Sequence, residues 1–329
     1  MNLTRRHMMG GAAALATVPM MSPTAAVAAA PPAGKQAPSF YRYKVGDIEV
    51  TAISDGTNNF ALPDTFVANK TKADVNAALE KAFLPPDKMS IPFAPVVVNS
   101  GGKLIAIDTG NGPAAFVNSK GNVGQYQTNL AAAGIDPKNI DMVVISHFHG
   151  DHINGLLNAE GKPLFPNAEI MASSSELKFW MDDGEMSRAP AGRMADLFKN
   201  ARRVLEAGLQ KKITPFEWGK EIAPGLTAVA APGHTPGHTA FIVASGSDKI
   251  FVQSDTTNHP AVFVANPGFH LVFDQDAKMA EETRRKIYDM LVAEKMRVQG
   301  YHFPFPAQGN VTKDGDGYRY FPVMWSSSL

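Results

Sequence analysis

Alternating apolar and polar residues predict two hairpins in the first third of the chain. "YRYKVGDIEVTAISDG" alternates around Gly46 and Asp47, and "PVVVNSGGKLIAIDTG" repeats the pattern around Gly101 and Gly102. A period of two places successive side chains on opposite faces of a strand, and small turn residues suit a tight reversal. Each segment therefore predicts a pair of antiparallel strands.

Apolar residues at helical spacing predict helices in other parts of the chain. Val75, Leu79 and Phe83 recur on one face of a predicted helix that Thr71 and Asp74 can cap. "QYQTNLAAAGI" predicts a short helix that ends at its glycine. Residues 174–208 predict mostly helix, and "QDAKMAEETRRKIYDMLVAEKM" predicts a long one.

The remaining apolar runs predict further strands. "MVVIS" is almost continuously apolar, as expected of a strand covered on both faces. "GLTAVAAPGHT", "AFIVAS" and "KIFVQSD" predict strands in the second half, and "RVQGYHFPFP" predicts the last strand and a loop. Strand-rich halves punctuated by helices predict an α/β protein with helices outside its sheets, in which residues 29–329 form one domain.

The first 28 residues predict an export signal. Arg5 and Arg6 precede an Ala/Met/Val-rich stretch, and Ala26-Val27-Ala28 offers a cleavage site of small residues. "TRRHMM" is typical of a twin-arginine signal, which would place the mature protein in the periplasm or outside the cell. A membrane anchor is the alternative, and the prolines and weak hydrophobicity of this stretch disfavour it.

Composition narrows the chemistry. The 329 residues include 31 Lys and Arg and 31 Asp and Glu, for a formal net charge of zero, and no basic run occurs. This balance disfavours nucleic acid or an anionic membrane as the main partner. The chain has no cysteine, which excludes disulfides, thiolate ligands and a cysteine nucleophile.

Three histidines and an aspartate lie within six positions of "ISHFHGDHINGL", directly after the apolar "MVVI" run. His147 and His149 are two apart on an extended segment and project to one side. Gly150 allows a tight turn, after which Asp151 could be the N-cap of a helix that begins at His152. Imidazoles and a carboxylate gathered in this way predict a site for zinc or a similar divalent metal.

Further candidate ligands follow other predicted strands. His234 and His238 lie in "AAPGHTPGHT", Asp255 ends "FVQSD", and His302 lies in "GYHFPFP". Each position is at the carboxyl end of a predicted strand, the usual edge for a site in α/β sheets.

These motifs resemble those of the metallo-β-lactamase fold superfamily over most of the mature chain. H-x-H-x-D-H, the "GHTPGH" histidine, a strand-end aspartate and a late histidine carry the resemblance. It implies an αββα sandwich of two mixed β-sheets flanked by helices. More narrowly, "ISDGT", "DTG", "FPNA", "FW" and "HFPFP" resemble methyl parathion hydrolase and its lactonase and arylesterase relatives.

The resemblance implies a pair of divalent metal ions. It assigns His147, His149 and His234 to one ion, Asp151, His152 and His302 to the second, and Asp255 to both. Asp151 and Asp255 would then take part in catalysis. Zinc is the expected metal, while manganese, cobalt and iron accept the same nitrogen and oxygen ligands. Such a pair holds a bridging hydroxide that attacks a carbonyl carbon or a phosphorus.

Roles for the neighbouring residues are less sharply defined. Asp108 either orients a metal-binding histidine or caps the turn that follows it. His238 is expected to support the loop of His234. Phe116, Trp180 and Phe198 fall where the resembled hydrolase has its leaving-group pocket, but aromatic residues at helical spacing also suit a core. A pocket lined by them would favour apolar, aryl or acyl-bearing substrates.

The function expected from the resemblance is the hydrolysis of lactones or aryl esters, with organophosphate triesters as further substrates. The expected partner is a small-molecule substrate. The protein is expected to have no stable membrane anchor, and a homodimer would suit the subfamily. A β-lactam hydrolase is one alternative, because fold alone does not assign function. An iron-dependent redox enzyme and a non-catalytic binding module are alternatives from other classes.

Overall fold

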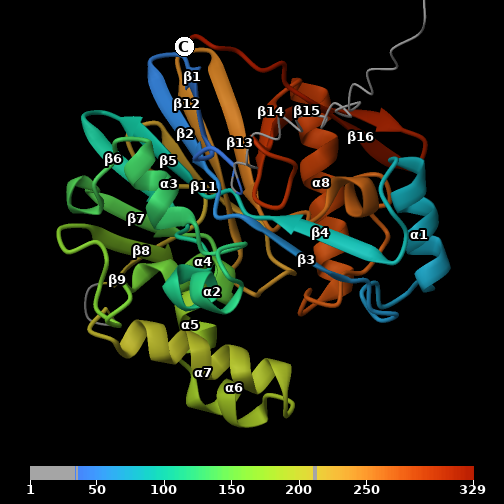
Figure 1. Ribbon diagram of the computed structural model, residues 1–329, viewed down its shortest axis with the longest axis horizontal. Coiled ribbons are helices and arrows are strands. Elements are labelled where there is room, and N and C mark those ends of the chain that lie inside the picture. The colour runs from blue at the N-terminus through green and yellow to red at the C-terminus, as the bar shows by residue number, and fades with distance from the viewer. Residues whose placement is uncertain (1–33, 35, 210–212) are drawn as a thin grey trace, which may run out of the picture. The chain divides into compact units, whose positions relative to one another are not determined.

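Two seven-stranded sheets form the centre of the protein, with helices on their outer faces (Figure 1). The computed structural model describes residues 34, 36–209 and 213–329, and every element below lies in the unit Pro38–Leu329. The predicted export signal lies outside the described residues.

The first sheet consists of the two predicted hairpins and three further strands that run parallel to β6. Both hairpins are antiparallel, and β6 to β9 run parallel to one another. In spatial order the strands are β1 (Phe40–Val45), β2 (Ile48–Ile53), β5 (Val96–Ser100), β6 (Lys103–Ile107), β7 (Met142–Ile145), β8 (Glu169–Ser173) and β9 (Ile213–Phe216).

The second sheet is also mixed, with one parallel pair, β13 and β14. Its strands are β10 (Glu221–Ala223), β11 (Leu226–Ala230), β12 (Thr239–Ser245), β13 (Asp248–Ser254), β14 (Arg297–Gly300), β15 (Gln308–Asp314) and β16 (Gly317–Pro322). The prediction that β14 is the last strand was wrong, because the polar β15–β16 hairpin follows it. That hairpin buries little of its outer half and so lacks a strong apolar alternation.

The burial of β7 explains the layered arrangement. Val143 and Ile145 pack toward the helices, whereas Met142 and Val144 pack toward the second sheet. All four are buried, so the "MVVI" run does lie between two covered faces. Helices α3, α5 and α7 cover the first sheet and α8 covers the second, which confirms the predicted αββα sandwich (Figure 1).

The helices begin where the sequence supplies caps. Thr71 and Asp74 form a capping box at the start of α1, as predicted. Phe83 does not share the buried face of α1, since it follows the helix with a positive φ and is 98% exposed. The helices are α1 (Lys72–Lys81), α2 (Gly112–Asn118), α3 (Tyr126–Ala132), α4 (Gly150–Ile153), α5 (Ser174–Trp180), α6 (Asp183–Arg188), α7 (Arg193–Glu206) and α8 (Ala277–Glu294).

A separate two-stranded sheet, β3 (Thr57–Ala61) and β4 (Lys88–Pro92), packs with α1 and with a π-helical turn at Pro260–Val264. Leu62, Phe66, Val75 and Phe263 are among the buried residues of this cluster. None of the described helices combines the length and apolarity needed to span a bilayer.

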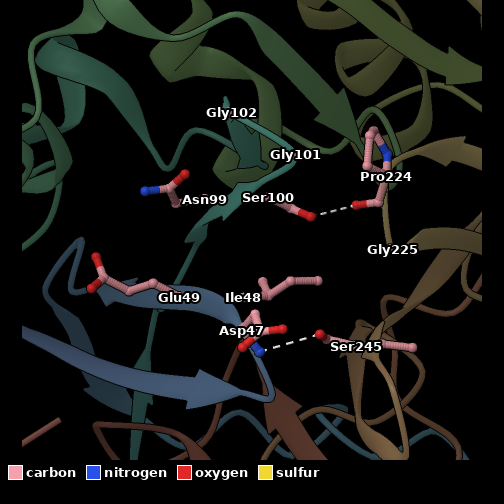
Figure 2. A pocket seen from close by; sticks show the side chains of 11 residues that line it. Asp47, Ile48, Glu49, Asn99, Ser100, Gly101, Gly102, Pro224, Gly225 and Ser245 are labelled. Carbon is pink, nitrogen blue, oxygen red and sulfur yellow. Dashed lines mark hydrogen bonds between the residues drawn. The ribbon is translucent and has the colours of Figure 1, made fainter.

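Hairpin turns close the sandwich at the amino ends of β6 and β13 and line a polar cleft of about 430 Å³. Figure 2 shows the residues around this cleft. Two hydrogen bonds join the turns of the two sheets there. The Asp47 amide donates to Ser245 Oγ (3.2 Å), and Ser100 Oγ donates to the Pro224 carbonyl (2.6 Å). None of the predicted site residues lines this cleft. The site lies at the other ends of these strands.

Candidate metal centre

The seven predicted ligands come from four segments that each follow a strand. His147, His149, Asp151 and His152 follow β7, and His234 lies beyond β11. Asp255 directly follows β13, and His302 follows β14. One strand of the first sheet and three of the second therefore bring them to one edge of the sandwich.

The turn after β7 differs from the prediction in one detail. Helix α4 begins at Gly150, with His149 at the N-cap position and no side-chain cap. Asp151 therefore lies inside the first turn and was wrongly expected to cap it. Its carboxylate is left free to face the cavity, where its side chain is 25% exposed.

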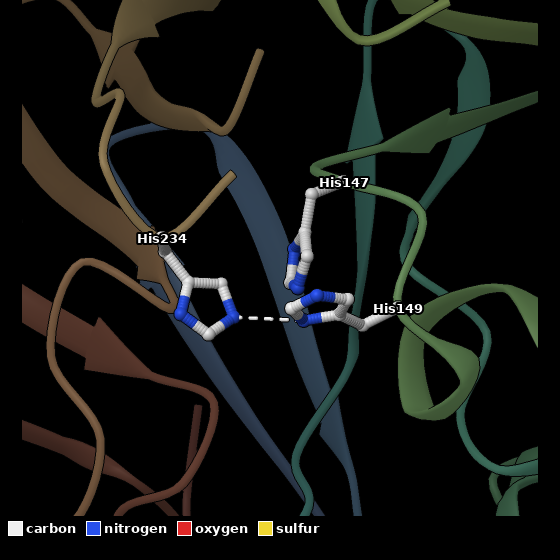
Figure 3. Close-up of side chains that lie close together, drawn as sticks. All are labelled: His147, His149 and His234. Atoms are coloured by element: carbon white, nitrogen blue, oxygen red, sulfur yellow. Dashed lines mark hydrogen bonds between the residues drawn. The ribbon is translucent and has the colours of Figure 1, made fainter. Parts of the chain in front are cut away.

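The structure brings all seven side chains into one cluster. Three groups have potential ligand atoms within 4.8 Å of one another: His147, His149, His234; His147, His152, Asp255; and Asp151, His152, His302. Figure 3 shows His147 and His149 on one loop facing His234 on another, with His234 Nε2 2.9 Å from His149 Nδ1.

Asp255 lies between the two halves of the cluster. Its Oδ2 is 3.2 Å from His234 Nε2 and 3.1 Å from His302 Nε2, while its Oδ1 is 3.3 Å from His152 Nε2. Asp151 Oδ2 lies 3.4 Å from His152 Nε2 and 3.6 Å from His302 Nε2. One carboxylate is thus shared by both groups of histidines.

Unpartnered atoms show that the cluster suits cations. His147 Nε2, His152 Nε2 and Asp255 Oδ1 are buried and have no hydrogen-bond partner. A buried polar atom without a partner is costly unless an ion or water satisfies it. Burial and the neighbouring His152 hold the pKa of His147 well below its usual range, so its imidazole is neutral, the form that binds metal. The His and Asp cluster therefore fits two divalent metal ions.

Asp108 orients His152. Its Oδ2 lies 2.8 Å from His152 Nδ1 and accepts from Ser146 Oγ at 2.7 Å. Its Oδ1 accepts from the Ser146 amide at 2.8 Å. A carboxylate on Nδ1 fixes the tautomer that turns Nε2 toward a metal. Of the two roles left open for Asp108, this geometry matches the orienting one.

Asp274 has the corresponding contact with His234, which no sequence pattern predicted. Asp274 Oδ1 lies 2.8 Å from His234 Nδ1, and Oδ2 lies 3.2 Å from the guanidinium of the buried Arg284. Asp274 follows no strand and belongs to no spaced motif. Only packing of α8 and its preceding loop brings it to the site.

His238 supports the site through hydrogen bonds between both of its ring nitrogens and backbone groups. Its Nδ1 donates to the Ala231 carbonyl at 2.8 Å, and its Nε2 accepts from the Asp255 amide at 2.9 Å. Burial lowers the pKa of His238 to about 3, so the ring is neutral and can make both contacts. It joins the loop of His234 to the backbone of Asp255.

A cavity of about 470 Å³ opens beside the cluster. It contains the ligand residues His149, Asp151, His234, Asp255 and His302. Apart from Gly150, its other lining residues divide into an aromatic and aliphatic group and a group of amides with one cation: Phe60, Ile91, Phe93, Leu197, Phe273; Asn58, Asn111, Asn154, Asn258, Arg193. The site can therefore enclose a small molecule with an apolar part and hydrogen-bonding groups.

The three aromatic residues expected in the pocket are absent from this lining. Trp180 and Phe198 are buried in the core, with ring centroids 4.7 Å apart. Trp180 supports His149 from behind, at 6.0 Å between ring centroids. Phe116 is 42% exposed on α2. The prediction that these three residues line the pocket is therefore corrected. The helical spacing of Trp180 and Phe198 reflects packing of α5 and α7 against the first sheet.

Comparison with known proteins agrees with the geometry. A model of the metallo-beta-lactamase superfamily matches residues 95–293. Ribonuclease Z of Aeropyrum pernix is 30% identical over 99 residues, so the chain spans only 26% of the length of this curated relative.

Solved structures match nearly the whole fold. AidC, a dizinc quorum-quenching lactonase in complex with the product N-hexanoyl-L-homoserine, has a TM-score of 0.80 and 25% identity, over 88% of this chain and 98% of that one. AbOPH, a hydrolase in the beta lactamase superfamily, has a TM-score of 0.81 and 25% identity, over 89% of this chain and 100% of that one. A probable metal-dependent hydrolase from Staphylococcus aureus shares the fold, with a TM-score of 0.69 and 19% identity over 87% of this chain and 100% of that one.

An αββα sandwich with a His and Asp cluster at its strand ends, beside a substrate-sized cavity, fits a metal-dependent hydrolase. The chain belongs to the metallo-beta-lactamase superfamily.

Proposed function

We propose that this protein hydrolyses lactones and aryl esters, with organophosphate triesters as secondary substrates. The observation that carries the proposal is the cavity, which joins the metal-ligand cluster to an apolar wall and to neutral amides. Such a wall suits an uncharged ester with an acyl or aryl group better than a charged substrate. The likeness to a lactonase supports the same substrate class.

Two metal ions bound by the cluster would supply Lewis acidity and an activated water. We assign His147, His149 and His234 to one ion, Asp151, His152 and His302 to the other, and Asp255 to both. The three groups with ligand atoms within 4.8 Å support this division. Zinc is the metal we expect, and manganese, cobalt or iron would suit the same ligands.

The chain's own side chains orient substrate and move protons. Asp151 has a partly exposed carboxylate at the cavity, so Oδ2 can accept a proton from water and return it to the leaving oxygen. Asn58 and Asn258 line the same cavity and offer amide N–H groups for the ester oxygens. Phe93 packs against His302 at 5.3 Å between ring centroids and excludes water from that side.

A β-lactam hydrolase is the second candidate within the family. Most β-lactams carry a carboxylate, and Arg193 is the only cation among the residues that line the described cavity. Its guanidinium already donates to the carbonyls of Val272 and Phe273, at 2.5 and 3.3 Å. This engagement disfavours Arg193 as a carboxylate receptor. An iron-dependent redox reaction remains the alternative from another class.

A substrate panel tests the proposal. We expect kcat/KM for an acyl-homoserine lactone and for dihydrocoumarin to exceed that for methyl parathion and for a carbapenem. Faster turnover of the carbapenem would overturn the assignment, and faster turnover of methyl parathion would make phosphotriesters the main substrates. Oxygen consumption in place of hydrolysis would favour the redox alternative. Exhaustive chelation should abolish turnover, and added metal should restore it.

We propose further that residues 1–28 direct export and that the mature enzyme forms a homodimer. The twin arginines and the small-residue cleavage site support export. Light scattering on the purified protein would distinguish a dimer from a monomer.

A further inference from the structure

A buried carboxylate, Glu176, lies behind the metal-ligand cluster on α5. It is 0% exposed and belongs to none of the groups of potential ligands. Its two oxygens accept four hydrogen bonds from neutral donors on segments far apart in the sequence. A buried charge needs such contacts, because desolvation of an unpaired carboxylate is costly.

Each oxygen serves a different ligand loop. Oε1 accepts from the Phe148 amide at 2.8 Å and from Trp180 Nε1 at 2.6 Å. Oε2 accepts from Thr235 Oγ1 at 2.8 Å and from the Gly237 amide at 2.9 Å. Phe148 stands between His147 and His149, and Thr235 follows His234. One carboxylate therefore holds both backbones that carry the His147, His149 and His234 group.

Helix α5 packs closely against the loop that carries His234. A Cβ at Gly237 would lie 2.1 Å from the Glu176 nitrogen, so only glycine allows this approach. Ser173, the N-cap of α5, accepts from the Glu176 amide and donates to the Gly237 carbonyl at 2.7 Å. Because the loops follow β7 and β11 of different sheets, these contacts fix a distance that neither sheet sets by itself.

We propose that Glu176 is a positioning residue that preorganises the three-histidine metal site by clamping the two ligand loops together. The inference rests on the metal binding assumed in the proposed function. A carboxylate suits this role because all four neighbours are donors and a carboxylate is acceptor-only. Holding the imidazoles at short range before binding removes an ordering cost from metal binding.

Glu176→Gln tests the clamp with almost no change in shape. Whichever way the amide faces, its NH₂ group meets a backbone N–H, so one hydrogen bond to a ligand loop is lost: the bond from Phe148 in one orientation and the bond from Gly237 in the other, where Thr235 Oγ1 can turn to accept. Glu217→Gln is the matched control: Glu217 accepts from Ser174 Oγ at 2.6 Å at the same end of α5, but contacts no ligand loop. Thr235→Val removes one of the four donors at constant volume.

The full chain is stripped of metal and titrated with zinc against a chromophoric chelator and with cobalt(II) by visible spectroscopy. We expect Glu176→Gln to weaken the affinity of one of two zinc ions by roughly 10- to 100-fold and to alter the cobalt spectrum. Thr235→Val should act in the same direction, more weakly, and Glu217→Gln should match the wild type.

The clamp is overturned if Glu176→Gln keeps wild-type zinc affinity and cobalt spectrum while the metal-free and metal-loaded forms lose equal thermal stability. Should Glu176→Gln fail to fold, unchanged zinc affinity in Thr235→Val overturns it instead. No substrate is present in these measurements. A wild-type protein that binds two metals but opens no lactone would therefore refute the proposed function and leave the clamp standing.

Discussion

His234 Nε2 lies 2.9 Å from His149 Nδ1, although the residues are 85 positions apart and follow strands of different sheets. These two nitrogens can share at most one hydrogen. His149 Nε2, on the other side of the ring, is buried without a hydrogen-bond partner. The contact places these ligand loops at metal-binding range.

Removal of His234 should therefore remove one metal. We expect His234→Ala to bind about one zinc ion in place of two and to lose hydrolytic activity, because three nitrogen ligands become two. Metal analysis after dialysis measures the stoichiometry. His270→Ala is the control, since His270 pairs with Glu281 and belongs to no ligand group. Two retained zinc ions in His234→Ala would contradict the assignment.

Asp274→Asn should weaken both metal binding and folding. The change removes the carboxylate that holds His234 Nδ1 and leaves the buried Arg284 without its charged partner. We expect a 10- to 100-fold loss of metal affinity and a loss of unfolding free energy of about 3–5 kcal/mol. Chelator competition and urea unfolding measure the two effects. Glu281→Gln breaks a partly exposed histidine contact nearby and should leave metal affinity unchanged.

Asp55 should give the metal-free protein an unusual pH dependence. Burial raises the pKa of Asp55 from 3.8 to about 6, although the Asn111 and Tyr126 amides donate to it. Between pH 4 and pH 6 the folded state thus retains a proton that the unfolded state releases, so stability falls as pH rises through this range. The shift of about two units corresponds to about 3 kcal/mol.

Asp55→Asn removes this titration. Wild-type stability should therefore decline relative to Asp55→Asn from pH 4 to pH 6 and hold a constant offset above that, as measured by urea unfolding with chelator present. Asp47→Asn, in the exposed β1–β2 turn, should show no such trend. A relative gain in wild-type stability as pH rises would mean that the amide donors outweigh burial.

Adjacent residues on α7 should separate substrate binding from stability. Leu197 lines the cavity, so Leu197→Ala should raise KM for long-chain acyl lactones by up to roughly tenfold, because burying a leucine-sized contact contributes about 1.5 kcal/mol. Phe198 is 1% exposed, so Phe198→Ala should instead cost about 3–5 kcal/mol of stability. Kinetics on short and long acyl chains, with thermal unfolding, test the pair. The reverse pattern would place Phe198 at the substrate.

The proposed export signal predicts a change in location. Replacing Arg5 and Arg6 with lysine should retain the protein in the cytoplasm, because twin-arginine export reads the arginine pair. Cell fractionation measures the distribution, and N-terminal sequencing of the exported form should begin near Ala29. Unchanged export would argue against the twin-arginine route.

The candidate ligands and the layers could both be predicted from the sequence. Period-two patterns, an apolar run covered on both faces and polar residues directly after strands are local features, and parallel strand ends meet at one edge whatever the details of packing. His147, Asp255 and His302 could be predicted for that reason. The resemblance to a known family then indicated how such residues divide between two metals.

Which side chains support the ligands, and which line the cavity, follows only from the three-dimensional packing. Glu176 and Asp274 lie outside any motif, and each reaches its histidine loop through the packing of a helix or loop on a sheet. Trp180 has the same helical spacing whether it faces a core or a pocket, so its pattern could not separate the two. Contacts between distant segments depend on how both sheets and their helices pack, which local sequence patterns do not encode.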